Sequence, residues 1–230
     1  MDRIAAASVV LLSGGQDSTT CLAWARRRFD RVYSVAFDYG QRHRVELEAA
    51  EAVAVRAGVN RHRVVPVSSL ADLGGNALVG DGPDDAVETL DADTGLPATF
   101  VPGRNLFFLT LAAAWAYQLE VAHLVTGVCE TDFSGYPDCR HATMESLQET
   151  LCLGLAREVV IHTPLMELDK AATVRLAAEL DALDLLAWSH TCDRGAVPPC
   201  GRCPACRLRA KGFARVGIPD PLIERLEGRG

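Results

Sequence analysis

A short apolar run near the start of the chain ends abruptly at a pair of glycines. Residues 8–12 read Ser-Val-Val-Leu-Leu, the pair Gly14-Gly15 follows, and residues 17–28 have a helical pattern. A brief apolar run bounded by glycine is typical of a buried strand. Glycine permits a tight turn with inward-pointing amides, and the N-terminus of the next helix adds further N–H groups. The chain is therefore predicted to begin with a strand, an anion-binding turn and a helix.

The same order of strand and helix recurs along the chain. Repeated β-then-α order predicts a Rossmann-like α/β fold, a parallel five-stranded sheet with helices on both faces. Ligands of such sheets bind at the carboxyl ends of the strands, so the functional residues are expected there. Strands are predicted at 8–12, 32–37, 63–67, 123–127 and 159–163, and helices at 17–28, 43–57, 104–119, 142–158 and 170–180.

Acidic residues gather in two stretches of the chain, one in a predicted helix and one in a long segment without periodicity. The predicted helix 43–57 carries Glu46, Glu48 and Glu51, which we expect on an exposed face. Residues 68–103 show no periodicity and hold six acidic residues between Asp81 and Asp93. A loop of this length is either a functional lid or a solvated excursion, and both interpretations stay open.

Charge and hydrophobicity narrow the classes of partner. The net charge is -7, with 49% hydrophobic and 23% charged residues, a balance typical of globular proteins. A protein that binds a phosphate backbone usually carries a basic patch, so no stable nucleic-acid partner is expected. The apolar start is too short to span a bilayer or to act as a secretion signal. We expect a cytoplasmic protein with small-molecule substrates and no membrane partner.

Half of the eight cysteines crowd into one short stretch near the C-terminus. Cys200, Cys203 and Cys206 are spaced three apart, and Cys192 precedes them. Four thiolates at this spacing suit one structural tetrahedral zinc ion per chain. An iron–sulfur cluster is chemically possible, a redox pair needs only two cysteines, and His190 is a candidate substitute ligand. The remaining cysteines read as small core residues; they are Cys21, Cys129, Cys139 and Cys152.

These features divide the chain into two regions. Residues 1–188 are predicted to form the α/β domain, with the acidic loop 68–103 as an insertion. Residues 189–230 are predicted to form a small helical region around the four cysteines.

The turn after the first strand reads Ser-Gly-Gly-Gln-Asp-Ser from Ser13 to Ser18. Hydroxyl groups of Ser13, Ser18 and Thr19 can donate to phosphate, whereas Asp17 caps the helix or holds a magnesium ion that bridges phosphates. The lysine of a Walker A loop is missing, as is the dinucleotide fingerprint. This strand–turn–helix passage resembles the PP-loop of ATP-pyrophosphatases, which cleave ATP between its α and β phosphates.

Further stretches make the resemblance specific. Each follows a predicted strand or precedes a helix, so all can face one crevice; they are residues 37–43, 101–105, 134–140 and 163–165, with Lys170 close behind. Together with the phosphate loop and the cysteine cluster they resemble the 7-cyano-7-deazaguanine synthase family, QueC. The likeness runs from about residue 9 to residue 213.

This resemblance implies an adenine nucleotide alpha hydrolase-like fold and a ligase that forms carbon–nitrogen bonds. Such an enzyme converts 7-carboxy-7-deazaguanine and ammonia into 7-cyano-7-deazaguanine. One ATP adenylates the carboxylate, which ammonia converts into an amide. A second ATP activates the amide oxygen, whose loss leaves the nitrile. The family implies Mg²⁺ with ATP, a homodimer, and a place in queuosine biosynthesis.

Residue roles are carried over from the same resemblance. Asp17, Lys170 and Arg104 are the expected catalytic residues, with the two cations in the place of a Walker lysine. Tyr39, Phe133 or Tyr136 is expected to stack on the face of the purine, and Asp132 and Asp138 are expected to accept hydrogen bonds from its edge. His43 and His141 can carry protons. The ATP site is expected along the loop and first helix turns, at Leu12, Ser13, Gly14, Gly15, Gln16, Asp17, Ser18, Thr19, Thr20, Cys21 and Leu22.

Two rival functions stay open on the sequence. A tRNA-modifying PP-loop enzyme, such as a thiolase or a lysidine synthetase, would share the adenylation step but should carry a basic RNA-binding face. A zinc-ribbon binding module with a degenerate nucleotide fold would not cleave ATP.

Overall fold

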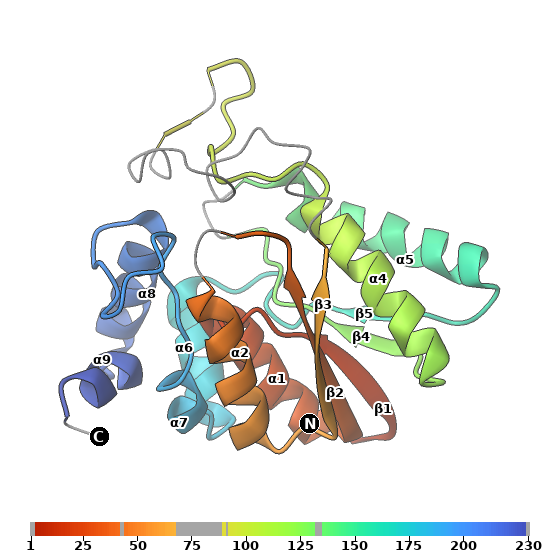
Figure 1. Cartoon of the computed structure of the whole chain (residues 1–230), viewed down its shortest axis with the longest axis horizontal. Helices are drawn as coiled ribbons and strands as arrows, with labels where there is room; N and C mark the ends of the chain where they lie inside the picture. The colour runs from red at the N-terminus through yellow and green to blue at the C-terminus, as the bar shows by residue number, and fades with distance from the viewer. Residues whose placement is uncertain (1–2, 42–43, 68–88, 91, 132–134, 229–230) are drawn as a thin grey trace.

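The computed structural model describes residues 3–41, 44–67, 89–90, 92–131 and 135–228. At its centre lies a parallel sheet in the order β3-β2-β1-β4-β5, which Figure 1 shows in side view. Each of the five predicted strands is confirmed, with small shifts at the ends. The strands are β1 (Ile4–Leu11), β2 (Phe29–Asp38), β3 (Arg61–Pro66), β4 (His123–Val125) and β5 (Val160–His162).

The five predicted helices are also present, and the C-terminal region adds more. The described helices are α1 (Gln16–Arg28), α2 (Val45–Ala57), α4 (Arg104–Gln118), α5 (His141–Leu155), α6 (Lys170–Glu179), α7 (Leu183–Leu186), α8 (Pro204–Val216) and α9 (Pro221–Leu226), with a 3-10 turn η2 (Pro137–Cys139). Among the described residues, no helix is both long enough and apolar enough to cross a membrane.

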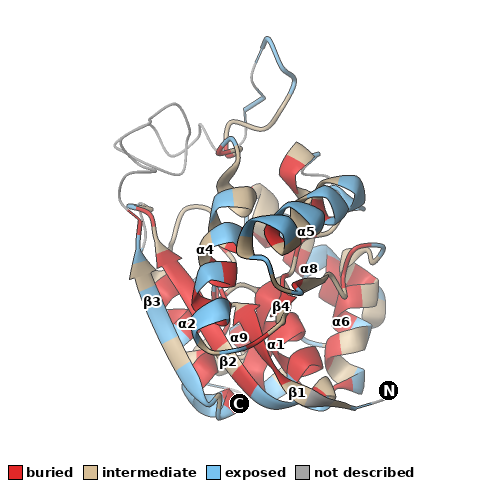
Figure 2. Cartoon of the chain, turned by 90° about the vertical axis from the view of Figure 1, so that its right-hand side faces the viewer, coloured by how far each residue is buried: buried red, intermediate tan, exposed pale blue. Residues whose placement is uncertain are grey.

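The helices cover both faces of the sheet (Figure 1). Residues of β1 alternate between the two cores: Val10 packs with α1, α2 and α6, whereas Val9 packs with α4 and α5. Both side chains are fully buried, as expected for a parallel strand covered on both sides. The edge strand β3 is largely exposed, as the pale colours in Figure 2 show.

The strand order places a crevice beside the first loop. The chain moves outward from β1 through β2 to β3, then returns to β4 on the other side of β1. The loops that leave β1 and β4 therefore turn in opposite directions, which opens a crevice at their carboxyl ends. The loop that follows β1 contains the two glycines.

The C-terminal helices pack against helices of the α/β domain rather than standing apart, α8 on α6 and α9 on α7. Helix α8 runs against α6 so closely that a Cβ on Gly212 would lie 3.0 Å from the Cβ of Lys170. The backbone N–H of His190 donates to the carbonyl of Gly14 at 2.8 Å. The division at residues 188 and 189 stays a prediction, and across it the two regions are in direct contact.

The turn between β1 and α1 is crossed at close range by the start of α2. Gly14 has a φ of +86°, in the left-handed region that favours glycine. A Cβ at this position would lie 2.3 Å from the carbonyl oxygen of Glu46 and 2.7 Å from the amide nitrogen of Ala50. Both are backbone atoms, so no side-chain rotation relieves the clash.

We therefore expect Gly14→Ala to lower the free energy of unfolding by about 2–4 kcal/mol, from backbone strain together with overpacking. Urea denaturation of the two proteins measures the difference. Gly15→Ala is the matched control, because its Cβ would meet nothing closer than 3.6 Å. Equal losses in the two variants would contradict this account of the turn.

Candidate active site

A cavity of about 400 Å³ opens at the carboxyl edge of the sheet. Its walls come from the ends of β1, β2 and β4, from the first turns of α2 and α4, and from the segment that carries the first cysteine of the cluster. Polar or aromatic side chains on these walls include Ser13, Asp17, Ser18, Tyr39, Gln41, Glu46, Thr99, Arg104, Asn105, Phe108, Tyr136 and Asp193. The cavity thus lies at the point where the strand order reverses, as expected for a ligand site of this fold.

The phosphate loop forms one wall. The hydroxyl oxygens of Ser13 and Ser18 are 3.0 Å apart, and Ser18 Oγ also donates to the carbonyl of Gly15 at 3.2 Å. Both serines line the cavity. The loop leads directly into α1, whose first N–H groups have no partner within the helix. Hydroxyl and amide donors that converge in this way suit a phosphate group.

Asp17 and Lys170 form an ion pair at the base of this wall. Lys170 Nζ lies 2.6 Å from Asp17 Oδ2, and the two side chains are 15% and 29% exposed. The other carboxylate oxygen, Asp17 Oδ1, is buried and has no hydrogen-bond partner. A carboxylate oxygen left open beside a phosphate loop fits a magnesium ligand. The structure thus brings together two of the three predicted catalytic residues.

The rest of the predicted ATP residues lie beneath the loop. The hydroxyl of Thr19 donates to the backbone carbonyl of Gly15, and the hydroxyl of Thr20 donates to that of Gln16. Cys21 and Leu22 are fully buried in the core, and burial raises the pKa of the Cys21 thiol. Gln16 is 2% exposed, and both polar atoms of its side-chain amide lack a partner. The prediction that these residues belong to the ATP site stays a prediction.

Arg104, the third predicted catalytic residue, lies on another wall of the cavity, at the start of α4. Its Nη1 donates to the hydroxyl of Tyr39 at 3.5 Å, and its guanidinium lies 5.8 Å from the centre of that ring. Burial works to lower the pKa of Arg104, but nearby tyrosine and carboxyl side chains outweigh it and raise the pKa. Tyr136 lines the same region, with its hydroxyl bonded to Thr99 Oγ1. Tyr39 and Tyr136, which were predicted for the purine, therefore share one end of the cavity with Arg104, which was predicted in the place of a Walker lysine.

Asp138 has structural partners instead of a place on the cavity wall. Its Oδ2 accepts from the backbone N–H of Asn105 at 3.0 Å, and the side chain is 5% exposed. It therefore anchors the first turn of α4, next to Arg104. Asp132, Phe133 and His43 lie outside the described residues. His141 is exposed and lies 3.4 Å from Glu145 on its own helix.

The sequence analysis did not assign two carboxylate side chains, Glu46 and Asp193, that line the cavity. Glu46, expected on an exposed face of α2, is partly buried and lines the cavity, so that expectation is wrong; Glu48 and Glu51 are exposed as predicted. The start of α2 crosses the loop at Gly14, which turns Glu46 toward the site. Asp193 lines the cavity directly after Cys192. Only their positions in the sequence could have indicated a role in the site, because Glu46 follows a predicted strand and Asp193 stands beside the cysteine cluster.

Burial raises the pKa of Glu46 to about 7; Arg104 opposes this shift and Asp193 adds to it. A carboxyl whose pKa is raised by folding holds its proton longer in the folded protein. The wild type therefore loses stability as pH rises from the ordinary value of 4.5 to about 7.

We expect the free energy of unfolding of Glu46→Gln, relative to wild type, to rise by about 1–3 kcal/mol between pH 5 and pH 8. Chemical denaturation at the two pH values measures the change. Glu48→Gln, an exposed position of the same helix, controls for the loss of one charge. A difference that stays constant with pH would refute the raised pKa.

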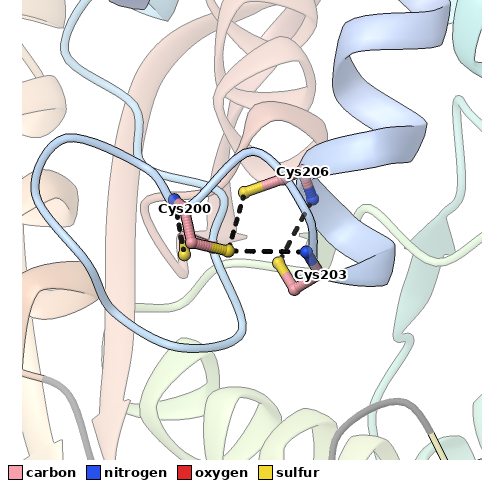
Figure 3. A group of neighbouring side chains, drawn as sticks. Cys200, Cys203 and Cys206 are labelled. Atoms are coloured by element: carbon pink, nitrogen blue, oxygen red, sulfur yellow. Dashed lines mark hydrogen bonds between the residues drawn. The ribbon is translucent and has the colours of Figure 1, made fainter. Parts of the chain in front are cut away.

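The four clustered cysteines converge near the same cavity. Their sulfur atoms all lie within 4.8 Å of one another, and His190 is not part of the group. The sulfurs of Cys200 and Cys206 are 3.9 Å apart, close to the separation of about 3.8 Å that a tetrahedral Zn–S distance near 2.3 Å requires. Backbone N–H groups of Cys203 and Cys206 point at the preceding sulfurs, at 3.4 and 3.5 Å, as Figure 3 shows. The donor set therefore fits a metal ion such as zinc.

Zinc analysis of the purified protein should find about one ion per chain. Cys203→Ser should lower that content and destabilise the C-terminal region, because a structural ion contributes directly to folding. Cys152→Ser, which removes a cysteine outside the cluster, should keep the full content. Retention of zinc by Cys203→Ser, or iron in place of zinc, would overturn the assignment.

Comparison with known proteins places these features in one family. The sequence model of the family described as "Queuosine biosynthesis protein QueC" matches residues 7–217. The 7-cyano-7-deazaguanine synthase of Laribacter hongkongensis is 57% identical over 223 residues, 96% of each chain. That of Chromobacterium violaceum is 58% identical over 222 residues, 96% of this chain and 94% of the relative.

A solved structure shares the fold at low sequence identity. It is described as a 4-thiouridine synthetase–RNA complex with bound ATP, and it superposes with a TM-score of 0.50 at 18% identity. The match covers 97% of this chain and 53% of that one. At this identity the likeness supports the α/β architecture alone.

Proposed function

We propose that this chain, which belongs to the QueC family of queuosine biosynthesis proteins, is an ATP-dependent ligase that converts 7-carboxy-7-deazaguanine and ammonia into 7-cyano-7-deazaguanine. The relatives from Laribacter and Chromobacterium are both named for that product. The structural observation that carries the proposal is the phosphate loop, with its Asp17–Lys170 pair, opening into the cavity at the carboxyl edge of the sheet.

The first stage makes a poor electrophile reactive. A carboxylate oxygen of the substrate attacks the α-phosphorus of ATP, the bond to the β-phosphate breaks, and pyrophosphate leaves. Ammonia then attacks the adenylated carbon, loses a proton, and displaces AMP to give the amide. The donors of Ser13, Ser18 and the start of α1 are suited to the charge that develops on the departing pyrophosphate.

The second stage repeats the activation on the amide. The amide oxygen attacks a second ATP, and pyrophosphate leaves again. Loss of both N–H protons and of AMP then forms the carbon–nitrogen triple bond. One cavity can serve both stages because each presents a carbonyl-type oxygen to the α-phosphate.

Asp17 and Lys170 are proposed to act at the phosphates, and Arg104 at the substrate end of the cavity. Asp17, whose Oδ1 has no hydrogen-bond partner, would hold Mg²⁺, and the ion would supply positive charge that offsets the charge of the phosphates. Lys170 holds the other oxygen of Asp17 in place. The ATP residues proposed remain those from Leu12 to Leu22.

At the substrate end, Tyr39 and Tyr136 are proposed to flank the purine, in a region where Phe108 also lines the cavity. Asp132 and Asp138 stay predictions for the purine edge. Asp138 Oδ2 accepts from the backbone N–H of Asn105 and Oδ1 accepts from Cys139 Sγ, so the supported part of Asp138 in the proposal is to hold the start of α4, where Arg104 lies.

Three further expectations belong to the same proposal. The ion in the cysteine cluster is proposed to be one structural zinc per chain, since four thiolates leave no open position for a substrate. The family resemblance leads us to propose a homodimer and a cytoplasmic location.

The direct test is incubation of the purified protein with ATP, Mg²⁺, ammonium and 7-carboxy-7-deazaguanine, followed by mass spectrometry. The proposal expects two AMP and two pyrophosphate per nitrile formed, and no nitrile without ammonium. An amide that accumulates would limit the proposal to its first stage. AMP formation only with another carboxylate would refute the substrate.

We expect Lys170→Met to lower kcat by about 10²–10³-fold, the loss typical of one transition-state electrostatic contact. Steady-state AMP release measures it. Arg175→Met removes an exposed cation from the same helix and should keep wild-type turnover. A Lys170→Met enzyme with normal kcat would remove the ion pair from the catalytic assignment.

A further inference from the structure

The segment between α7 and the first cysteine lies against the phosphate loop. The backbone N–H of His190 donates to the carbonyl of Gly14 at 2.8 Å. The hydroxyl oxygen of Thr191 accepts from the backbone N–H of Gln16 at 3.1 Å. Gln16 is the first residue of α1, and its N–H is one of the helix-start donors that have no partner within the helix. Residues far along the chain therefore hold both ends of the short turn 14–16.

The hydroxyl of Thr191 is itself fixed by a buried arginine. Nη1 of Arg209 donates to Thr191 Oγ1 at 3.3 Å and to Ser189 Oγ at 2.8 Å. Nε and Nη2 bind the two carboxylate oxygens of Asp220 at 2.6 and 2.8 Å, and Nη2 also donates to the carbonyl of Leu186. Each of the five N–H groups of a guanidinium that is only 3% exposed thus has a partner. A bidentate pair of this kind fixes direction as well as charge.

The oxygen of the Thr191 hydroxyl therefore accepts two hydrogen bonds, which come from different elements of the fold. Arg209 on α8 donates one and the first amide of α1 donates the other. Asp17 and Ser18, which line the cavity, follow Gln16 directly along the helix. A shift of the helix start moves both of these side chains, and small misplacements of reacting groups are costly. Thr191 is also followed at once by Cys192, so the metal-binding segment and the loop share one support.

We propose that Thr191, held by Arg209, is a positioning residue for the phosphate loop, through which the C-terminal metal-binding segment sets the geometry of the ATP site. Neither residue touches the substrate in this proposal. It rests on the proposed function only for its kinetic readout.

The test compares Thr191→Val with Thr191→Ser. Valine keeps the shape and removes the hydroxyl, which leaves the buried N–H of Gln16 without a partner; serine keeps the hydroxyl. Hydrogen exchange of the amides at the start of α1 is the first readout, because it requires no catalysis. We expect about tenfold faster exchange there in Thr191→Val, with wild-type exchange in Thr191→Ser.

The second readout is ATP–pyrophosphate exchange with zinc content measured in parallel. Thr191→Val should raise the KM for ATP about tenfold, with the zinc content unchanged. Ser189→Ala is the matched control, since it removes another hydroxyl bound by Arg209 without a contact to the loop. It should leave the KM for ATP at the wild-type value.

Several results would overturn the inference. Wild-type exchange and KM in Thr191→Val would do so, as would a Thr191→Ser protein that behaves like the valine variant. If the valine variant does not fold, Thr191→Ala provides the same comparison at a smaller volume. A wild-type protein that cleaves no ATP would refute the proposed function, while hydrogen exchange would still decide the role of Thr191.

Discussion

The cavity depends on the close approach of two backbones, Gly14 of the first loop and the opening turn of α2. No side chain separates them, so the loop fits only with glycine at this point and only with α2 in its observed place. The contact fixes the loop relative to β2, because α2 follows that strand. It also turns Glu46 into the cavity. The position of the phosphate loop and the position of Glu46 in the cavity thus both follow from one packing constraint.

Charge is distributed in the cavity as two separate groups. Asp17 and Lys170 neutralise each other beside the loop, at 2.6 Å. At the other group, Arg104 has Glu46 and Tyr39 among its electrostatic neighbours. This separation suits a reaction with two anionic reactants, because phosphate and carboxylate can each find a cation without competing for the same one. The acidic net charge of -7 does not prevent it, since the donors are local.

The sequence was enough to predict the sheet and the cysteine cluster, because both depend on local patterns. Apolar runs of strand length alternate with helical periods, and the spacing of Cys200, Cys203 and Cys206 directs their sulfurs to one point. Residues whose surroundings come from distant segments could not be assigned in this way. Glu46 faces the cavity because α2 crosses Gly14, and Asp138 accepts from the backbone N–H of Asn105, which lies 33 positions earlier in the chain. Neither contact leaves a periodic signal in the chain.

The contacts of His190 and Thr191 with Gly14 and Gln16 join the loop after β1 to a segment about 175 positions further along the chain. A ribosome releases residues 189–209 long after the loop. The strand and helix on either side of the loop can pair before then and α2 can pack on Gly14, but the contacts of residues 190 and 191 with Gly14 and Gln16 form only when the cysteine segment emerges. The wall that carries the phosphate loop is therefore completed only when residues 189–209 emerge, and a chain interrupted before them would carry the Ser-Gly-Gly-Gln-Asp-Ser motif without the contacts that hold residues 14 and 16.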